Sequence, residues 1–280
     1  MRGYFVHIEE KLGGEIVKSP PINYEPLRGI EYINKIEFYL PQMLPMLEGE
    51  KEPEDYPRRT LYAFNCPCGM CDYAGLCLHG DIMGLTIDVE LVGKATDKNA
   101  IFLSPTQLIR YETCPRQWAY HVAGYRTEIS SAKLQFGDSI HSAIEAYIRL
   151  GEKPKESFLF FWGEYKDASL RYSRKDTNHE YFQRVGVSLM EKFPDFYTRE
   201  IISELKISEI QAETLNAKRL NLSKDYFGRP VYLVCKPDLI CKTNDGETIV
   251  IDWKVTTKKA FDWNWLSVSD QMTGYFLFLS

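Results

Sequence analysis

Apolar residues recur along the chain with two different periods, which predict both strands and helices. The segment 3–21, GYFVHIEEKLGGEIVKSPP, holds two short apolar runs around a Gly-Gly pair, so we expect a hairpin. Residues 27–44 then carry apolar side chains at helical spacing, and this helix is expected to end near Pro41. Residues 85–99 follow as a strand that runs into a polar linker.

From residue 104 onward the pattern is mainly helical. The segment 104–124 begins with a Ser cap and a Pro at an early helical position, a typical helix start. A second helix is expected over 131–151, closed by Gly151, and residues 155–206 are predicted to be mostly helical and rich in aromatic residues. The end, SVSDQMTGYFLFLS, predicts a capped helix with Gln271 and Tyr275 one turn apart.

Two apolar strands, RPVYLVCKPDLICKT and ETIVIDWKVTTK, are joined by the turn NDG. Side chains alternate along a strand, so Asp252 and Lys254 are expected on one face, and a hairpin pairing would bring Asp238 beside them. Two carboxylates and an ammonium on one surface suit a hard divalent cation and a water that attacks phosphate.

The simpler interpretation is that these are ordinary strand-end residues and that Lys254 forms a salt bridge. Against it stands the segment IVIDWK, where charged residues interrupt an apolar run of the kind that is normally buried. Buried charge is costly without a partner, so we expect something to compensate it.

Four segments in this order, FGDSIH, KPDLI, VIDWK and QMTGY, resemble the PD-(D/E)XK nucleases of the RecB type. This group includes the RecB and AddB nuclease domains and the CRISPR-associated RecB-like exonucleases. The resemblance implies a metal site with His141, Asp238, Asp252 and the main-chain carbonyl of Trp253 as ligands. It also implies that Lys254 is the catalytic lysine and that Gln271 and Tyr275 support the site and DNA binding. An upstream Glu often joins such sites, and both Glu209 and Glu213 are candidates.

The resemblance further implies an α/β fold, a restriction-endonuclease-like core with a mixed central sheet flanked by helices and a helical insertion over about 155–206. The expected activity is that of a deoxyribonuclease that uses Mg2+ or Mn2+ and acts as an exonuclease on single- or double-stranded DNA. Two alternatives stay open: an inactive nuclease fold that binds DNA or a partner protein, and a zinc-binding scaffold unrelated to nucleases.

Cysteines gather in FNCPCGMCDYAGLC, at positions 66, 68, 71 and 77, and a fifth follows in ETCPRQWAY. In the iron–sulfur branch of the resembled family, a Cys-Pro dipeptide begins the nuclease domain and three spaced cysteines follow its last helix. The resemblance therefore implies that Cys68, Cys71, Cys77 and Cys114 hold a structural [4Fe–4S] cluster. Zinc bound by the four local cysteines is the alternative, and the role of Cys66 stays open.

Because three of these cysteines precede the nuclease motifs, we expect a circular permutation. Residues 1–80 would be the permuted C-terminal part, 81–100 the linker between the old ends, and 101–280 the nuclease core. Exposed connections tolerate such rearrangements. Cys235 and Cys241 lie on an apolar strand and are expected to be core thiols.

Composition adds a few limits. The 280 residues are 44% hydrophobic, enough for a substantial core. The formal net charge of -5 gives no global positive field. A local basic groove is still possible, and the candidates to form it are Arg110, Arg116, Arg126, Lys254, Lys258 and Lys259. No apolar run suits a signal peptide or a membrane span, which favours a cytoplasmic protein. The permuted order is also compatible with a homo-oligomer whose copies exchange segments.

Overall fold

The computed structural model describes residues 1–58, 71–88, 99–212, 216–223, 226, 228–256 and 269–280. The chain divides into two compact units. The first unit comprises Met1–Tyr24, Ile129–Leu215 and Lys236–Met272, and the second comprises Glu25–Glu128, Asn216–Cys235 and Thr273–Ser280. Both units are therefore assembled from segments far apart in the sequence.

The first unit is built on the largest sheet of the protein, with strand order β2-β1-β13-β12-β9 and β3 paired with β1. Its elements are β1 (Arg2–Glu9), β2 (Ile16–Lys18), β3 (Ile22–Asn23), β7 (Ser130–Ser131), α6 (Ala132–Leu150), α7 (Pro154–Gly163), β8 (Leu170–Arg171), α8 (His179–Phe196), a π-helical turn (Tyr197–Ser203), β9 (Ile207–Ala212), β12 (Leu239–Thr243) and β13 (Thr248–Thr256).

The sheet is mixed, as predicted. β1 and β2 form the expected antiparallel hairpin, and β12 and β13 pair antiparallel across the turn at 244–246. β1 also runs parallel to β13 over its whole length, from Arg2 opposite Ile249 to Glu9 opposite Thr256. The strand at the start of the sequence thus lies beside the strand that carries Asp252 and Lys254.

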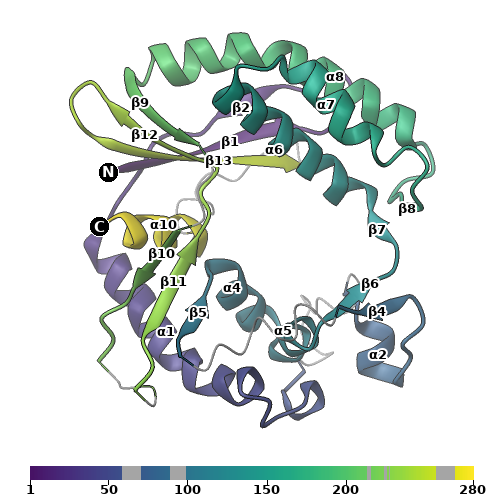
Figure 1. Ribbon diagram of the computed structural model, residues 1–280, viewed down its shortest axis with the longest axis vertical. Helices are drawn as coiled ribbons and strands as arrows, with labels where there is room; N and C mark the ends of the chain where they lie inside the picture. The colour runs from purple at the N-terminus through teal and green to yellow at the C-terminus, as the bar shows by residue number, and fades with distance from the viewer. Residues whose placement is uncertain (59–70, 89–98, 213–215, 224–225, 227, 257–268) are drawn as a thin grey trace. The chain divides into compact units, whose positions relative to one another are not determined.

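Helices α6, α7 and α8 cover one face of this sheet (Figure 1). Alternate strand residues point into the core that they enclose, among them Val6, Ile251 and Trp253. On the helices, Phe136, Phe158, Trp162 and Phe182 form a buried aromatic cluster in that core. The segment 155–206 is mostly helical, as the sequence predicts, and it supplies much of the core of this unit.

The second unit holds α1 (Pro26–Leu47), a short 3-10 turn (Pro53–Asp55), α2 (Ala74–His79), β4 (Leu85–Ile87), β5 (Ile101–Leu103), α4 (Pro105–Thr113), α5 (Pro115–Val122), β6 (Tyr125–Thr127), β10 (Asn216–Arg219) and β11 (Val231–Cys235). β10, β11 and β5 form a three-stranded sheet, and β4 pairs with β6. Helix α10 (Asp270–Leu279) begins in the first unit and ends in the second. No helix within the described ranges is long and apolar enough to cross a bilayer.

The prediction that the first helix ends near Pro41 is wrong, because α1 continues through Pro41 and Pro45 to Leu47. Pro41 has no N–H to donate to the carbonyl of Glu37, four residues earlier. The hydroxyl of Tyr226 donates to that carbonyl instead, at 3.5 Å. A contact from a distant segment thereby replaces part of the lost helical bonding.

Two other predicted elements are each divided by a proline. The helix expected over 104–124 is split into α4 and α5 at Cys114, which is extended because a proline follows it. The apolar strand expected over 229–243 is split at Pro237 into β11 of the second unit and β12 of the first. Asp238 therefore precedes β12 and does not end the strand before it.

We predict that Gly186→Ala destabilises the first unit. A Cβ at Gly186 of α8 would lie 2.0 Å from the ring of Phe158, which Phe136 and Trp162 hold in place. Such overpacking costs about 1–3 kcal/mol, which a thermal melt would detect as a lower Tm. Gly163→Ala is the matched control, since its Cβ would meet nothing within 4 Å. Equal Tm values for the two variants would contradict the packing described here.

Candidate active site

Asp252 and Lys254 lie on the face of β13 opposite to the helix-covered core, since Ile251 and Trp253 point into that core. Their expected common face is confirmed by contact: Lys254 Nζ lies 2.5 Å from Asp252 Oδ2. Asp252 is only 2% exposed, whereas Lys254 is about one-third exposed. The lysine thus neutralises a buried carboxylate while its own ammonium group reaches solvent.

Gln271, on the first turn of α10, joins these two residues. Its Oε1 accepts a hydrogen bond from Lys254 Nζ at 2.9 Å, and its Nε2 donates to Asp252 Oδ1 at 3.1 Å. The amide therefore satisfies one group of each sign and fixes the position of the lysine relative to the carboxylate. The hydroxyl of Ser269 accepts a hydrogen bond from the Gln271 N–H, which caps this helix as the sequence predicts.

Asp238 stands directly before β12 and bonds to β13. Its Oδ2 accepts a hydrogen bond from the main-chain N–H of Trp253 at 2.6 Å. Its Oδ1 lies 3.3 Å from Nδ1 of His141, which α6 supplies. The same carboxylate thus connects the strand bearing Asp252 to the helix bearing His141.

Burial and neighbouring charges shift the pKa values of these groups. Burial raises the pKa of Asp252, the charge of Asp238 raises it further, and Lys254 and His141 oppose both effects. Burial alone would lower the pKa of His141, but the hydrogen bond and negative charge of Asp238 outweigh it and raise that pKa. The four side chains act on each other electrostatically and form one site.

The donor chemistry of this site fits a hard divalent cation, because the carboxylate in the middle of β13 and the one just before β12 repel each other. A bound cation would offset that repulsion. Within the described ranges, however, no three His, Cys, Asp or Glu side chains form a group that could hold a metal ion. Each carboxylate is instead paired with a basic side chain, Asp238 with His141 and Asp252 with Lys254. The ligand set expected from the sequence stays a prediction.

Comparison with known proteins identifies the family. A family model described as the PD-(D/E)XK nuclease superfamily matches residues 102–280. The chain belongs to this superfamily. Its members are generally nucleases and typically use Mg2+ or Mn2+. The mixed sheet with flanking helices confirms the predicted restriction-endonuclease-like fold class. Searches of curated proteins and of solved structures found no match.

Of three further residues expected near the site, the structure describes Glu209 and Tyr275. The side chain of Glu209, on β9, is 68% exposed. Glu209 pairs with Lys242 of β12, three residues beyond the start of that strand, so it is not part of the site. Glu213 lies outside the described residues. Tyr275 follows Gln271 by one turn of α10, is buried, and falls within the second unit.

Sequence reasoning missed two side chains that act on the site. Phe5 of β1 is the direct neighbour of Asp252, and its ring centroid lies 5.8 Å from Lys254 Nζ. Asp138, one turn before His141 on α6, has a pKa raised by burial and opposed by the charges of His141 and Lys236. The position of Asp138 in FGDSIH was the available signal, whereas Phe5 required knowledge of the parallel pairing.

The candidate cluster cysteines are only partly described. Burial raises the pKa of Cys71, a backbone hydrogen bond at Tyr73 opposes this, and Cys114 and Cys77 raise the pKa further, so both lie near Cys71. Cys66 and Cys68 lie outside the described residues. Cys235 and Cys241 are buried, as predicted for core thiols, and burial raises the pKa of each to about 12.

The His141–Asp238 pair predicts a pH effect in metal-free buffer. The raised pKa of His141 means that the pair stabilises the fold fully below pH 6.5, and that this stabilisation is lost as the pH rises through the folded-state pKa. Asp238→Asn should therefore lower the pKa of His141, which an NMR titration of its imidazole signals would measure. The variant should also lose more stability at acidic than at alkaline pH.

The matched control is Asp245→Asn, since Asp245 is exposed in the turn between β12 and β13. It should leave the titration of His141 unchanged. An unaltered pKa in Asp238→Asn would contradict the pairing.

Proposed function

We propose that the protein is a divalent-metal-dependent deoxyribonuclease of the RecB/AddB type that acts as an exonuclease. The observation that carries this proposal is the network of Asp252, Lys254 and Gln271, since it joins three of the motif residues of the superfamily in one site. The order of the sequence motifs supports the RecB-like assignment.

In this proposal Asp238, Asp252 and His141, with the main-chain carbonyl of Trp253, would hold Mg2+ or Mn2+. When bound, the ion polarises the scissile phosphate and lowers the pKa of a water molecule. Lys254 orients the attacking water and offsets negative charge on the phosphate, a function that suits an ammonium group that reaches solvent. Gln271 holds Lys254 in place, and Tyr275 supports DNA binding.

The permuted order finds support in the parallel pairing of β1 with β13. Parallel neighbours in a sheet are normally joined by a crossover of a dozen or more residues that usually includes a helix. Helix α10 follows β13, while the parallel neighbour β1 comes from the opposite end of the sequence. We infer that residues 1–80 correspond to the part of a RecB-like nuclease that follows the helix of Gln271, with residues 81–100 as the linker.

A structural [4Fe–4S] cluster on Cys68, Cys71, Cys77 and Cys114 is the second part of the proposal. The electrostatic effect of Cys114 and Cys77 on Cys71 places these thiols near one another and supports it. Thiolates are the ligands of such clusters, and several nearby thiols resist ionisation until a metal binds. The cluster would connect the segment around α2 to the junction of α4 and α5.

Loss of the site lysine should abolish cleavage. We expect Lys254→Met, and separately Asp252→Asn, to lower the rate of DNA hydrolysis with Mg2+ or Mn2+ by about 100-fold or more, because charge stabilisation in the transition state is lost. Cleavage of end-labelled DNA measures this, and circular dichroism confirms that the variants fold. Lys242→Met is the matched control, since Lys242 lies on the same sheet but pairs only with exposed Glu209 at 3.7 Å.

Full activity of Lys254→Met would disprove the assignment of the catalytic lysine. A wild-type protein that binds DNA but never cuts it with Mn2+ would favour the inactive binding module instead.

Anaerobically purified protein should be brown, with iron and sulfide in equal amounts. Cys114→Ala should lose the colour and the iron. Cys235→Ala should keep both, because the pKa of this buried thiol is raised to about 12 and it stays protonated. A colourless protein that holds one zinc and is unaffected by Cys114→Ala would contradict the cluster and favour a local zinc site.

A further inference from the structure

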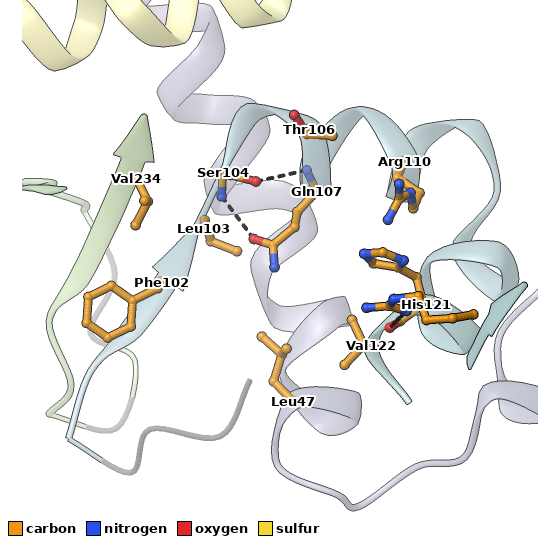
Figure 2. A pocket seen from close by; sticks show the side chains of 11 residues that line it. Leu47, Phe102, Leu103, Ser104, Thr106, Gln107, Arg110, His121, Val122 and Val234 are labelled. Carbon is orange, nitrogen blue, oxygen red and sulfur yellow. Dashed lines mark hydrogen bonds between the residues drawn. The ribbon is translucent and has the colours of Figure 1, made fainter. Parts of the chain in front are cut away.

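The second unit contains a cavity of about 410 Å3 that lies apart from the carboxylate site in the sequence and in its chemistry. It is bordered by the end of α1, by β5, by the start of α4 and by the segment from α5 to β6 (Figure 2). The lining residues that carry the argument are Phe102, Thr106, Gln107, Arg110, His121 and Arg126. The carboxylates of the catalytic network have no counterpart among the lining residues.

One end of the cavity is strongly basic. Arg110 and His121 face each other across it (Figure 2), and Arg126 adds a second guanidinium group, anchored by bonds to the carbonyls of His121 and Tyr125 at 2.9 and 2.7 Å. Among the described residues, no carboxylate forms an ion pair with either arginine. Two half-buried cations therefore share one small space.

This arrangement is electrostatically unfavourable for the free protein. Burial lowers the pKa of Arg110, Tyr73 opposes this effect, and the neighbouring charge of Arg126 lowers the pKa further. Burial and the two arginines lower the pKa of His121 to about 4, so its imidazole is neutral at physiological pH and can donate one N–H. An anion in the cavity would offset the two positive charges, with which no carboxylate of the described residues forms an ion pair.

Neutral donors complete the basic end. Gln107 closes the cap of α4: its N–H donates to Ser104 Oγ at 3.2 Å, and its Oε1 accepts from the Ser104 N–H at 2.9 Å. With its oxygen engaged in the cap, the amide nitrogen of Gln107 points away from these bonds (Figure 2). Thr106 lines the same space with an exposed hydroxyl. Planar guanidinium groups with amide and hydroxyl donors are typical of phosphate recognition.

The opposite end of the cavity is aromatic. Phe102 of β5 is 43% exposed and stacks on Tyr232 of β11, with ring centroids 5.4 Å apart and planes inclined by 24°. Tyr232 supports the ring from one side, and the exposed aromatic surface is available to a further flat group. A charged end that suits phosphate and an aromatic end that suits a base match the two parts of a nucleotide in an unpaired strand.

We propose that this cavity binds one nucleotide of single-stranded DNA, with a backbone phosphate against Arg110, Arg126 and Gln107 and the base against Phe102. Stacking on an exposed ring requires a base that is not paired in a duplex, so the site selects single strands. The identity of the strand as DNA rests on the proposed function, whereas the phosphate-and-base chemistry rests on the cavity itself.

The test measures binding of fluorescein-labelled oligo-dT by anisotropy in EDTA, so that no hydrolysis can occur. Arg110→Gln should weaken binding about tenfold or more. It should also reduce the slope of a plot of log Kd against log salt concentration by about 0.7, because one phosphate contact is lost. Arg58→Gln is the matched control, because Arg58 is an exposed arginine of the same unit that does not line the cavity. Phe102→Leu should weaken single-strand binding and leave duplex binding unchanged.

A thermal melt separates recognition from folding. Arg110→Gln removes a charge that repels Arg126, so the Tm of the free protein should be equal to or higher than that of the wild type. A residue with a merely structural role would lower it. The proposal is overturned if Arg110→Gln weakens binding no more than Arg58→Gln, or if Phe102→Leu affects single and duplex DNA equally.

The outcome is independent of catalysis. A protein that binds oligo-dT through Arg110 but does not cut DNA when Mg2+ or Mn2+ is added would contradict the proposed function and support this site. A protein that cuts DNA, with oligo-dT binding and cleavage unchanged in Arg110→Gln, would overturn this site and leave the proposed function intact.

Discussion

Asp252 lies in the middle of the sheet with almost no exposure to solvent, and the arrangement around it follows from this burial. A buried carboxylate without a partner would cost several kcal/mol. Lys254 must therefore remain within contact distance, and Gln271 must bond to both. The lysine in turn passes over the ring of Phe5, so β1 has to lie beside β13. One desolvated charge thus links the strand order, the start of α10 and the position of the Lys254 ammonium group.

Much of this site could be predicted from the sequence, because its signals are local. The alternation along IVIDWK is enough to place Asp252 and Lys254 on one face, and the turn at 244–246 is enough to pair β12 with β13. Helix α6 with Gly151 at its end, the cap at Ser104 and the hairpin of β1 and β2 also follow from short-range rules. The superfamily match over residues 102–280 agrees with the motifs found there.

What could not be predicted depends on contacts between distant segments. Pro41 is tolerated within α1 because the hydroxyl of Tyr226, far along the chain, reaches the carbonyl of Glu37. The apolar run around Pro237 reads as one strand, yet its two halves join different sheets. The basic cavity is equally hidden: Arg110 and Arg126 are two of several scattered basic residues in the sequence, and only the fold brings α4 and β6 to the same cavity.

The parallel pairing of β1 with β13 has a consequence for the order in which the protein folds. Arg2 and Glu247 bond to each other across 245 positions of the sequence. During synthesis β1 leaves the ribosome well before β13, so in that interval one edge of the β1–β2 hairpin offers unpaired backbone groups. Contacts of such long range form slowly. The nascent chain therefore exposes an apolar strand edge until β13 has been made, and the site of Asp252 cannot form before these two distant strands pair.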